Sequence, residues 1–234
     1  MHTPLWPRTP WLALSGKRGE KYLFDYLVPG YEKKIKLAAS RTTSVATGEN
    51  EQTVANLAQE VADCVRCGLR DHATHVVFGD GNPQTDLLLV GDGTGAEEDK
   101  LGLPFVGPAG QLLTNILAAV EISREEVYLT DVVKCYPSEN RPPTTAEITT
   151  CVSHLQEQII RINPRIIVCL GTVAAQALID PTAQVAKLRG QWFERGGRRI
   201  MATYHPATLL AEQAKKRPVW HDMQKVRDAY RALT

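Results

Sequence analysis

Residues 87–99 read LLLVGDGTGAEED, an apolar strand followed at once by a glycine-rich turn. Similar apolar runs predict three more strands, and the four strands are expected at residues 86–91, 127–132, 165–171 and 199–204. Helical periodicity lies between and after them, at residues 109–120, 146–162, 173–179 and about 219–232. Because strands that alternate with helices build a parallel sheet covered on both faces, we predict a three-layer α/β/α fold with a central, mainly parallel four-stranded sheet.

The first 52 residues differ from the rest of the chain. They carry several aromatic residues, then a basic patch at residues 33–36 and a polar stretch at residues 40–52 without an apolar period. We therefore predict an N-terminal extension and linker at residues 1–52 and a single domain at residues 53–234. The first helix of that domain is expected at residues 53–64.

The composition is that of an ordinary globular protein, with 43% hydrophobic and 23% charged residues. A formal net charge of +1 gives no overall attraction to nucleic acid, so such binding needs a local basic face. Basic residues do cluster at 187–199 and 215–217, although charge runs are usually solvated surface. No apolar run reaches the roughly 18 residues of a membrane helix, so we expect a cytoplasmic protein without membrane contact.

The cysteines divide into four and one. A Cys-x-x-Cys pair and two distant cysteines, in a chain without a secretory signal, favour a metal or iron-sulfur centre over disulfides. These four are Cys64, Cys67, Cys135 and Cys151. Cys169 lies inside an apolar run and is predicted to be a small buried core residue.

Unusual residues follow each predicted strand. The carboxyl ends of parallel strands meet at one edge of the sheet, which is where α/β proteins bind ligands. The loops concerned are residues 91–99, 131–140, 171–172 and 204–206. Their convergence predicts one functional site.

Two nucleotide-binding motifs are disfavoured. Gly91, Gly93 and Ala96 fit a dinucleotide fingerprint, but no acidic residue ends a second strand about 20 positions later. A phosphate-binding P-loop is excluded because no Gly-Lys-Ser/Thr follows. Each site residue also has a commoner structural explanation when taken singly. Asp92 can stabilise its own turn, and Phe105 can anchor the core. A His-Pro pair such as that at His205 often only ends a strand.

Five motifs in order resemble the family 4 uracil-DNA glycosylases, the iron-sulfur branch of that superfamily. They lie at residues 91–99, 104–110, 128–135, 187–190 and 204–210. The resemblance runs from about Val54 to the C-terminus and includes all four cysteines, whereas residues 1 to about 50 have no counterpart. It implies a uracil-DNA glycosylase-like fold and a hydrolase of base-excision repair that flips a nucleotide out of double- or single-stranded DNA and cleaves its N-glycosidic bond. It further implies a structural [4Fe-4S] cluster on Cys64, Cys67, Cys135 and Cys151. We also expect a monomer that needs no nucleotide cofactor.

The resemblance assigns roles at the site. Asp92 orients or activates water and stabilises an oxocarbenium-like sugar, and His205 stabilises the leaving base anion by matching its charge. The base-binding residues are Gly91, Gly93, Phe105, which stacks on the base, and Asp131, which reads its edge. The DNA-binding residues are Arg189, Pro206, Leu209 and Leu210, and one of the two leucines wedges into the duplex.

Three positions depart from the family pattern. Asp92 replaces a glutamate, Thr94 a proline, and Asp131 an asparagine that reads uracil. An amide donates to uracil O4 and accepts from N3–H, whereas an ionised Asp131 only accepts and repels O4. An ionised carboxyl suits the N4 amino group of cytosine, and a protonated one also satisfies cytosine N3.

Three alternatives follow from these residues. The first is a glycosylase whose base specificity is shifted by Asp131. The second is a catalytically weak module that binds DNA damage. The third is a dinucleotide-binding protein built on the glycine turn.

Overall fold

Four parallel strands form the centre of the sheet, in the order β3-β2-β4-β6. They are β2 (Leu87–Gly93), β3 (Tyr128–Val133), β4 (Ile166–Leu170) and β6 (Arg198–Thr203). Two short antiparallel strands complete the edges, β1 (Asp80–Gly81) beside β3 and β5 (Trp192–Arg195) beside β6. The computed structural model describes residues 49–233, and there the predicted parallel four-stranded sheet is confirmed, with two edge strands that were not predicted.

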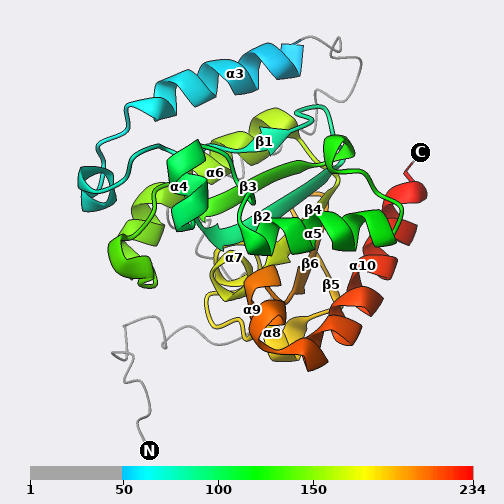
Figure 1. The fold of residues 1–234 in the computed structure, drawn as a ribbon. Helices are drawn as coiled ribbons and strands as arrows, with labels where there is room; N and C mark the ends of the chain where they lie inside the picture. Colours follow the sequence, from blue (N-terminus) through cyan, green and yellow to red (C-terminus); the bar gives the residue numbers. More distant parts are fainter. Residues whose placement is uncertain (1–48, 234) are drawn as a thin grey trace, which may run out of the picture.

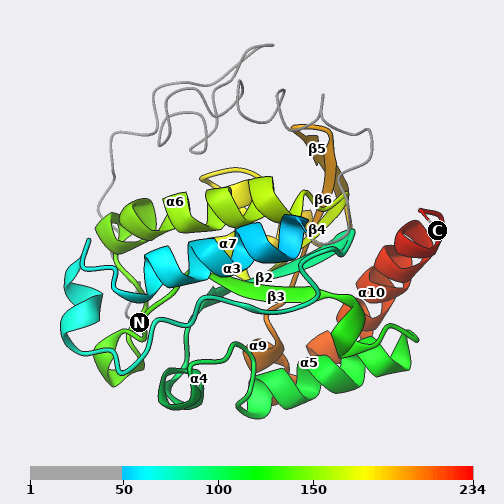
Figure 2. The same ribbon diagram turned by 90° about the horizontal axis from the view of Figure 1, so that it is seen from above.

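Helices cover both faces of the sheet (Figures 1 and 2), which confirms the three-layer arrangement. One layer contains α3 (Glu49–Ala62), α6 (Thr145–Ile162), α7 (Thr172–Leu178) and α8 (Val185–Leu188). The other contains α5 (Pro108–Ala119), α9 (Pro206–Ala211) and α10 (Lys216–Arg231). The short helix α4 (Ala96–Leu101) follows β2, and single 3-10 turns occur at Gly68–Asp71, Arg124–Glu126, Ser138–Asn140 and Gln213–Lys215.

The sheet separates two hydrophobic cores. Successive residues of a strand point to opposite faces, and in β2 Leu88 and Val90 enter the core under α3 and α6. Leu87 and Leu89 enter the core under α5 and α10. Cys169 is fully buried in the first core, as predicted. A strand buried on both faces reads as a continuous apolar run, which is why LLLV marks the centre of the fold.

The strand order reverses beside β2. The chain passes from β2 to β3 on one side, then crosses back to β4 on the other side of β2. Connections that leave in opposite directions open a gap at the carboxyl ends of the two strands where the order reverses, here β2 and β4. The glycine-rich turn follows β2 and helix α7 follows β4, so both lie at this switch point.

Some boundaries differ from those predicted. Helix α3 begins at Glu49, four positions before the predicted start, so the end of the predicted linker is helical. The remainder of the predicted N-terminal extension lies outside the described residues. Strands β5 and β6 form a hairpin whose two-residue turn is Gly196-Gly197, both with positive φ, as such tight turns require.

None of the helices in the described part of the chain is long and apolar enough to span a membrane.

Candidate active site

The carboxylate of Asp92 is fixed at the amino end of α7. Its Oδ1 accepts a hydrogen bond from the backbone N–H of Ala174 at 2.9 Å, and the N–H groups of Thr172 and Val173 also bond to it. Gly171 has a φ of 114°, and a Cβ there would lie 2.2 Å from Asp92 Oδ2. Only glycine permits this approach, so the turn after β4 is built around the carboxylate of β2.

Burial raises the pKa of Asp92 from 3.8 to about 6, and the three backbone hydrogen bonds oppose the rise. The carboxyl is therefore ionised at neutral pH. Rather than stabilising its own turn, Asp92 caps a helix from the neighbouring strand. An ionised carboxylate held in one orientation can accept a proton from a water molecule.

Phe105 occupies a backbone conformation that aromatic residues seldom adopt. Its φ is 53°, in the left-handed region, and its side chain is almost completely buried. Arg124 Nη1 donates to the carbonyl oxygen of Phe105 at 3.0 Å, and Arg124 Nη2 donates to that of Pro104 at 2.8 Å. A Cβ at Gly110 would lie 1.8 Å from the Phe105 oxygen. Arg124 thus holds a strained turn in place, as is common at functional sites.

Glu98 holds the other side of the same turn. Its Oε1 accepts hydrogen bonds from the backbone N–H groups of Val106 and Gly107, at 3.0 and 2.9 Å. Sequence reasoning missed Glu98 and Arg124 as supports of Phe105. Glu98 lies within the motif quoted at the outset, but nothing in the sequence connects Arg124 with this turn.

His205 pairs with Phe105. The two ring centroids are 5.9 Å apart, with an angle of 28° between the ring planes. His205 Nδ1 accepts the backbone N–H of Ala207 at 3.1 Å and so caps α9, which leaves the proton of a neutral imidazole on Nε2. Burial lowers the pKa of His205 to about 4. The ring is neutral at physiological pH, so it offers a hydrogen bond from Nε2 rather than a positive charge.

Asp131 lies against Gly91 and Phe105. Its residue is 3% exposed, and a Cβ at Gly91 would lie 2.2 Å from Asp131 Oδ1 and 2.6 Å from Phe105 Cζ. Gly91 is therefore required for this close packing. Burial raises the pKa of Asp131, and the charges of Glu98 and Asp92 raise it further, while Lys134 opposes the rise.

Gly93 and Thr94 contact the end of β3. A Cβ at Gly93 would lie 3.5 Å from Val133 Cβ, an ordinary contact, so nothing steric requires glycine there. Thr94 Oγ1 donates to the Val133 carbonyl oxygen at 3.1 Å. Thr94 thus fastens the glycine-rich turn to β3, and the base-binding role of Gly93 stays a prediction.

The four cysteines of the predicted cluster form no disulfide. Burial raises the pKa of Cys135 to about 12, and the negative charges that Cys151, Cys67 and Cys64 carry as thiolates raise it further, so the four lie within electrostatic reach of one another. No three His, Cys, Asp or Glu side chains in residues 49–233 are gathered closely enough for a single metal ion. In a [4Fe-4S] cluster, however, each thiolate binds a different iron, so the ligands stand farther apart.

Polar groups already approach the sulfur atoms. The backbone N–H of Lys134 donates to Cys151 Sγ at 3.3 Å, and His154 Nε2 lies 3.3 Å from Cys64 Sγ. Hydrogen bonds to thiolate sulfurs are part of such cluster sites. The donor set and its surroundings therefore fit the implied group.

The predicted DNA-binding leucines differ in burial. Leu209 is completely buried in the core, whereas Leu210 is 44% exposed on α9. Leu209 cannot reach DNA from the folded helix, so of the two only Leu210 is placed to act as a wedge. Pro206, the first residue of α9, is buried. The orientation of the short helix α9 determines which of the two adjacent leucines is exposed, and the sequence does not show that orientation.

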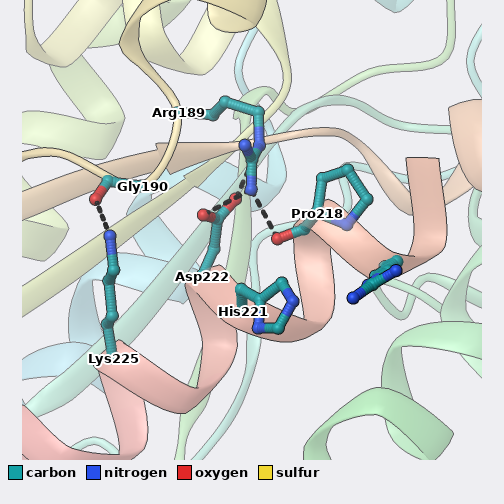
Figure 3. A pocket seen from close by; sticks show the side chains of 7 residues that line it. Arg189, Gly190, Pro218, His221, Asp222 and Lys225 are labelled. Carbon is teal, nitrogen blue, oxygen red and sulfur yellow. Dashed lines mark hydrogen bonds and ion pairs between the residues drawn. The ribbon is translucent and has the colours of Figure 1, made fainter.

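Arg189 lines a pocket that also carries Arg217 and Lys225 (Figure 3). Its guanidinium donates to both carboxylate oxygens of Asp222, at 3.0 and 2.7 Å, and to the Pro218 carbonyl oxygen. The pocket has a volume of about 330 Å³ and is lined by Arg189, Gly190, Arg217, Pro218, His221, Asp222 and Lys225. Thr203 Oγ1 donates to Asp222 Oδ2 at 2.6 Å, which joins this pocket to the end of β6. DNA binding by Arg189 stays a prediction.

The comparisons with known proteins agree with this geometry. Residues 78–224 match the model of the uracil DNA glycosylase superfamily. The type-4 uracil-DNA glycosylase of Thermotoga maritima is 40% identical over 183 residues, which cover 76% of this chain and 94% of that protein. The type-4 enzyme of Archaeoglobus fulgidus is 36% identical, with 75% and 92% covered. The type-5 enzyme of Thermus thermophilus is 30% identical, with 55% and 68% covered. The chain therefore belongs to the uracil-DNA glycosylase superfamily and, within it, to the type-4 family.

Proposed function

We propose that the protein is a uracil-DNA glycosylase of base-excision repair. The observation that carries this is the convergence of Asp92, Phe105, Asp131 and His205 at the carboxyl edge of one sheet. They supply a carboxylate, an aromatic face, a base-edge reader and a neutral hydrogen-bond donor. We propose that the protein acts as a monomer.

The chemistry follows from these side chains. The target nucleotide leaves the duplex because its sugar carbon cannot be reached inside the stack. Phe105 stacks on the base, and ionised Asp92 takes a proton from water as the water oxygen bonds to the sugar carbon. The glycosidic bond breaks and its electron pair moves to the base. His205 Nε2–H donates a hydrogen bond to the charge that develops there.

We propose that Cys64, Cys67, Cys135 and Cys151 hold a [4Fe-4S] cluster of structural role. The first two follow α3, Cys135 follows β3, and Cys151 lies within α6. When bound, the cluster supplies folding energy by joining these three segments. The catalytic side chains belong to other loops and do not depend on its redox chemistry.

The DNA contacts are proposed at the same edge. Leu210, exposed at α9, enters the gap left by the flipped base. The pocket beside Arg189 carries Arg217 and Lys225, whose charges suit the phosphates on either side of the target. Residues 1–52 are proposed to lie outside this catalytic domain.

A second candidate is a glycosylase with shifted base specificity. The observation that favours it is the carboxyl of Asp131 where the family reads uracil with an amide. If that carboxyl is ionised, it accepts the N4 amino group of cytosine and repels uracil O4.

Single-base duplexes test both candidates. Duplexes with uracil, hypoxanthine, xanthine, cytosine or thymine are incubated with the holoprotein and assayed for cleavage at the abasic product. We expect cleavage at uracil, and none by the Asp92→Asn variant. Cytosine release with uracil spared would establish the second candidate. Tight binding of damaged DNA without release of any base would replace both with a damage-binding module.

A further inference from the structure

Asp131 is a nearly buried residue whose carboxyl receives no hydrogen bond from a protein donor among the described residues. Its residue is 3% exposed, and among the residues that the structure describes none donates to its side-chain oxygens. A buried polar group usually has a partner, and an ionised one without donors is especially costly. A side chain at position 91 would collide with this carboxyl and with the Phe105 ring, so the glycine keeps that side of Asp131 open. The carboxyl is thus held at the base-binding position with its hydrogen-bonding capacity unused.

Among the described residues, the cation that acts on Asp131 is Lys134, and its ammonium group makes its hydrogen bonds to other atoms. Lys134 Nζ donates to the backbone oxygen of Asp131 at 2.7 Å, to Thr130 Oγ1 at 2.5 Å and to Gln158 Oε1 at 2.5 Å. An ammonium has three protons, and these three acceptors use them. Lys134 therefore faces the backbone of Asp131 and makes no hydrogen bond to its carboxyl.

The other charged groups that face Asp131 are acidic. Asp92 lies at the end of the adjacent strand β2, and Glu98 lies on α4. The apolar ring of Phe105 also lies near, since its Cζ and Asp131 Oδ1 both crowd the same point beside Gly91. Two carboxylates and an aromatic ring disfavour a third negative charge, while Asp92 has three backbone N–H groups to stabilise its own. The surroundings thus divide the two carboxyls into an ionised one, Asp92, and a neutral one, Asp131.

We propose that Asp131 reads the flipped base as a neutral carboxylic acid, so that the site admits bases with a keto group beside a ring N–H, as in uracil. The O–H donates to the keto oxygen, and the C=O accepts the ring N–H. This is the donor and acceptor pattern of an amide, whereas the ionised form has no donor. The inference rests on the proposed glycosylase function and names the form of Asp131 that serves it.

The proposal predicts how the rate of uracil release depends on pH. Burial and the two acidic neighbours raise the pKa of Asp131. Uracil release should therefore fall as pH rises through that pKa, because the donor is lost and the carboxylate repels the keto oxygen. Asp92 acts in the opposite sense, since it must be ionised. An asparagine at position 131 keeps its donor at every pH.

The test compares three holoproteins: wild type, Asp131→Asn, and Asp228→Asn as a matched surface control, since Asp228 is 66% exposed on α10. Single-turnover release of uracil is measured from about pH 5 to about pH 9. Wild type and the control should lose about tenfold in rate per pH unit on the alkaline side, and Asp131→Asn should stay flat there. Infrared difference spectra between wild type and Asp131→Asn should show the carbonyl band of a protonated carboxyl near neutral pH.

The outcomes separate the inference from the proposed function. An alkaline fall that persists in Asp131→Asn, or the absence of the protonated band, overturns the inference while uracil release upholds the glycosylase. Release by Asp131→Asn but never by wild type also overturns it, because the carboxyl is then ionised throughout. If neither protein releases uracil at any pH, the proposed function fails and the reading role with it.

Discussion

The carboxylate of Asp92 accepts a hydrogen bond from the backbone N–H of Ala174, 82 positions later in the sequence. The bond spans the gap between β2 and β4, where the strand order of the sheet reverses. It gives Asp92 a fixed orientation at the place where α/β proteins bind their ligands. The same residue thus stabilises the fold locally and presents a carboxylate to the site.

Asp92→Asn should lower turnover on uracil-containing DNA by at least about a hundredfold, since electrostatic stabilisation of this kind is worth ~3 kcal/mol. The asparagine oxygen can still accept the Ala174 N–H, so the fold and the affinity for DNA should change little. Single-turnover rates and equilibrium binding on the same duplex measure the two effects. Unchanged turnover would remove Asp92 from the mechanism.

The value of kcat/KM should fall about tenfold per unit as pH decreases below about 6, the raised pKa of Asp92. Only the ionised form can take a proton from water. Because the folded-state pKa lies above the ordinary 3.8, the protonated form favours folding, and this contribution is lost as pH rises through about 6. A rate that falls only near pH 4 would show that burial does not perturb Asp92.

Arg124→Ala should reduce uracil release by roughly ten- to a hundredfold, although Arg124 is not proposed to contact substrate. It removes the two hydrogen bonds that hold the strained turn at Phe105. Arg124→Lys keeps the charge but loses the paired donors and should be intermediate. Rates on single-turnover substrates and thermal melting check this. A loss of stability without a loss of rate would contradict a positioning role.

Anaerobically purified protein should be brown and contain about four irons per chain. Cys135→Ala should bleach the protein and lower its melting temperature, because one of four ligands is lost. Cys169→Ala is the matched control, since Cys169 is buried in the core away from the ligand set, and it should keep its colour. Iron analysis and visible absorption decide, and stoichiometric zinc without iron would refute the cluster.

Leu210→Ala should weaken uracil release from duplex DNA and leave release from single strands nearly unchanged, because a wedge acts only where bases are stacked. The neighbouring Leu209→Ala should instead cost about 2–5 kcal/mol of folding free energy, as expected for a fully buried leucine. Equal effects of Leu210→Ala on both substrates would exclude a wedge.

The sequence predicted the sheet centre and the site edge well, for a physical reason. Strands such as β2 are buried on both faces and read as unbroken apolar runs, and glycines mark the turns that follow them. Helix α4 was missed because AEEDKL has no apolar period. Hairpin β5–β6 was missed although Gly196-Gly197 between two β-rich runs is a usable hairpin signal.

The sequence singled out the residues of the candidate site, whose roles stay predictions, but it did not reveal the side chains that support them. Arg124 reaches Phe105 across 19 positions and Ala174 reaches Asp92 across 82, and no local pattern records such contacts. The neutrality of His205 likewise depends on burial and on the Ala207 N–H. These properties depend on contacts between residues that are far apart in the sequence, and local sequence patterns do not predict such contacts.

The contact among Gly91, Asp131 and Phe105 also limits which variants of this protein are accessible. A side chain at position 91 would meet both an Asp131 oxygen and the Phe105 ring, so position 91 stays glycine while those two remain. Substitutions there are epistatic: a change at 91 is tolerated only after both 131 and 105 have become smaller or have moved. Mutant libraries that seek a new base preference should therefore vary positions 91, 105 and 131 together, because a single substitution at 91 collides with the other two side chains.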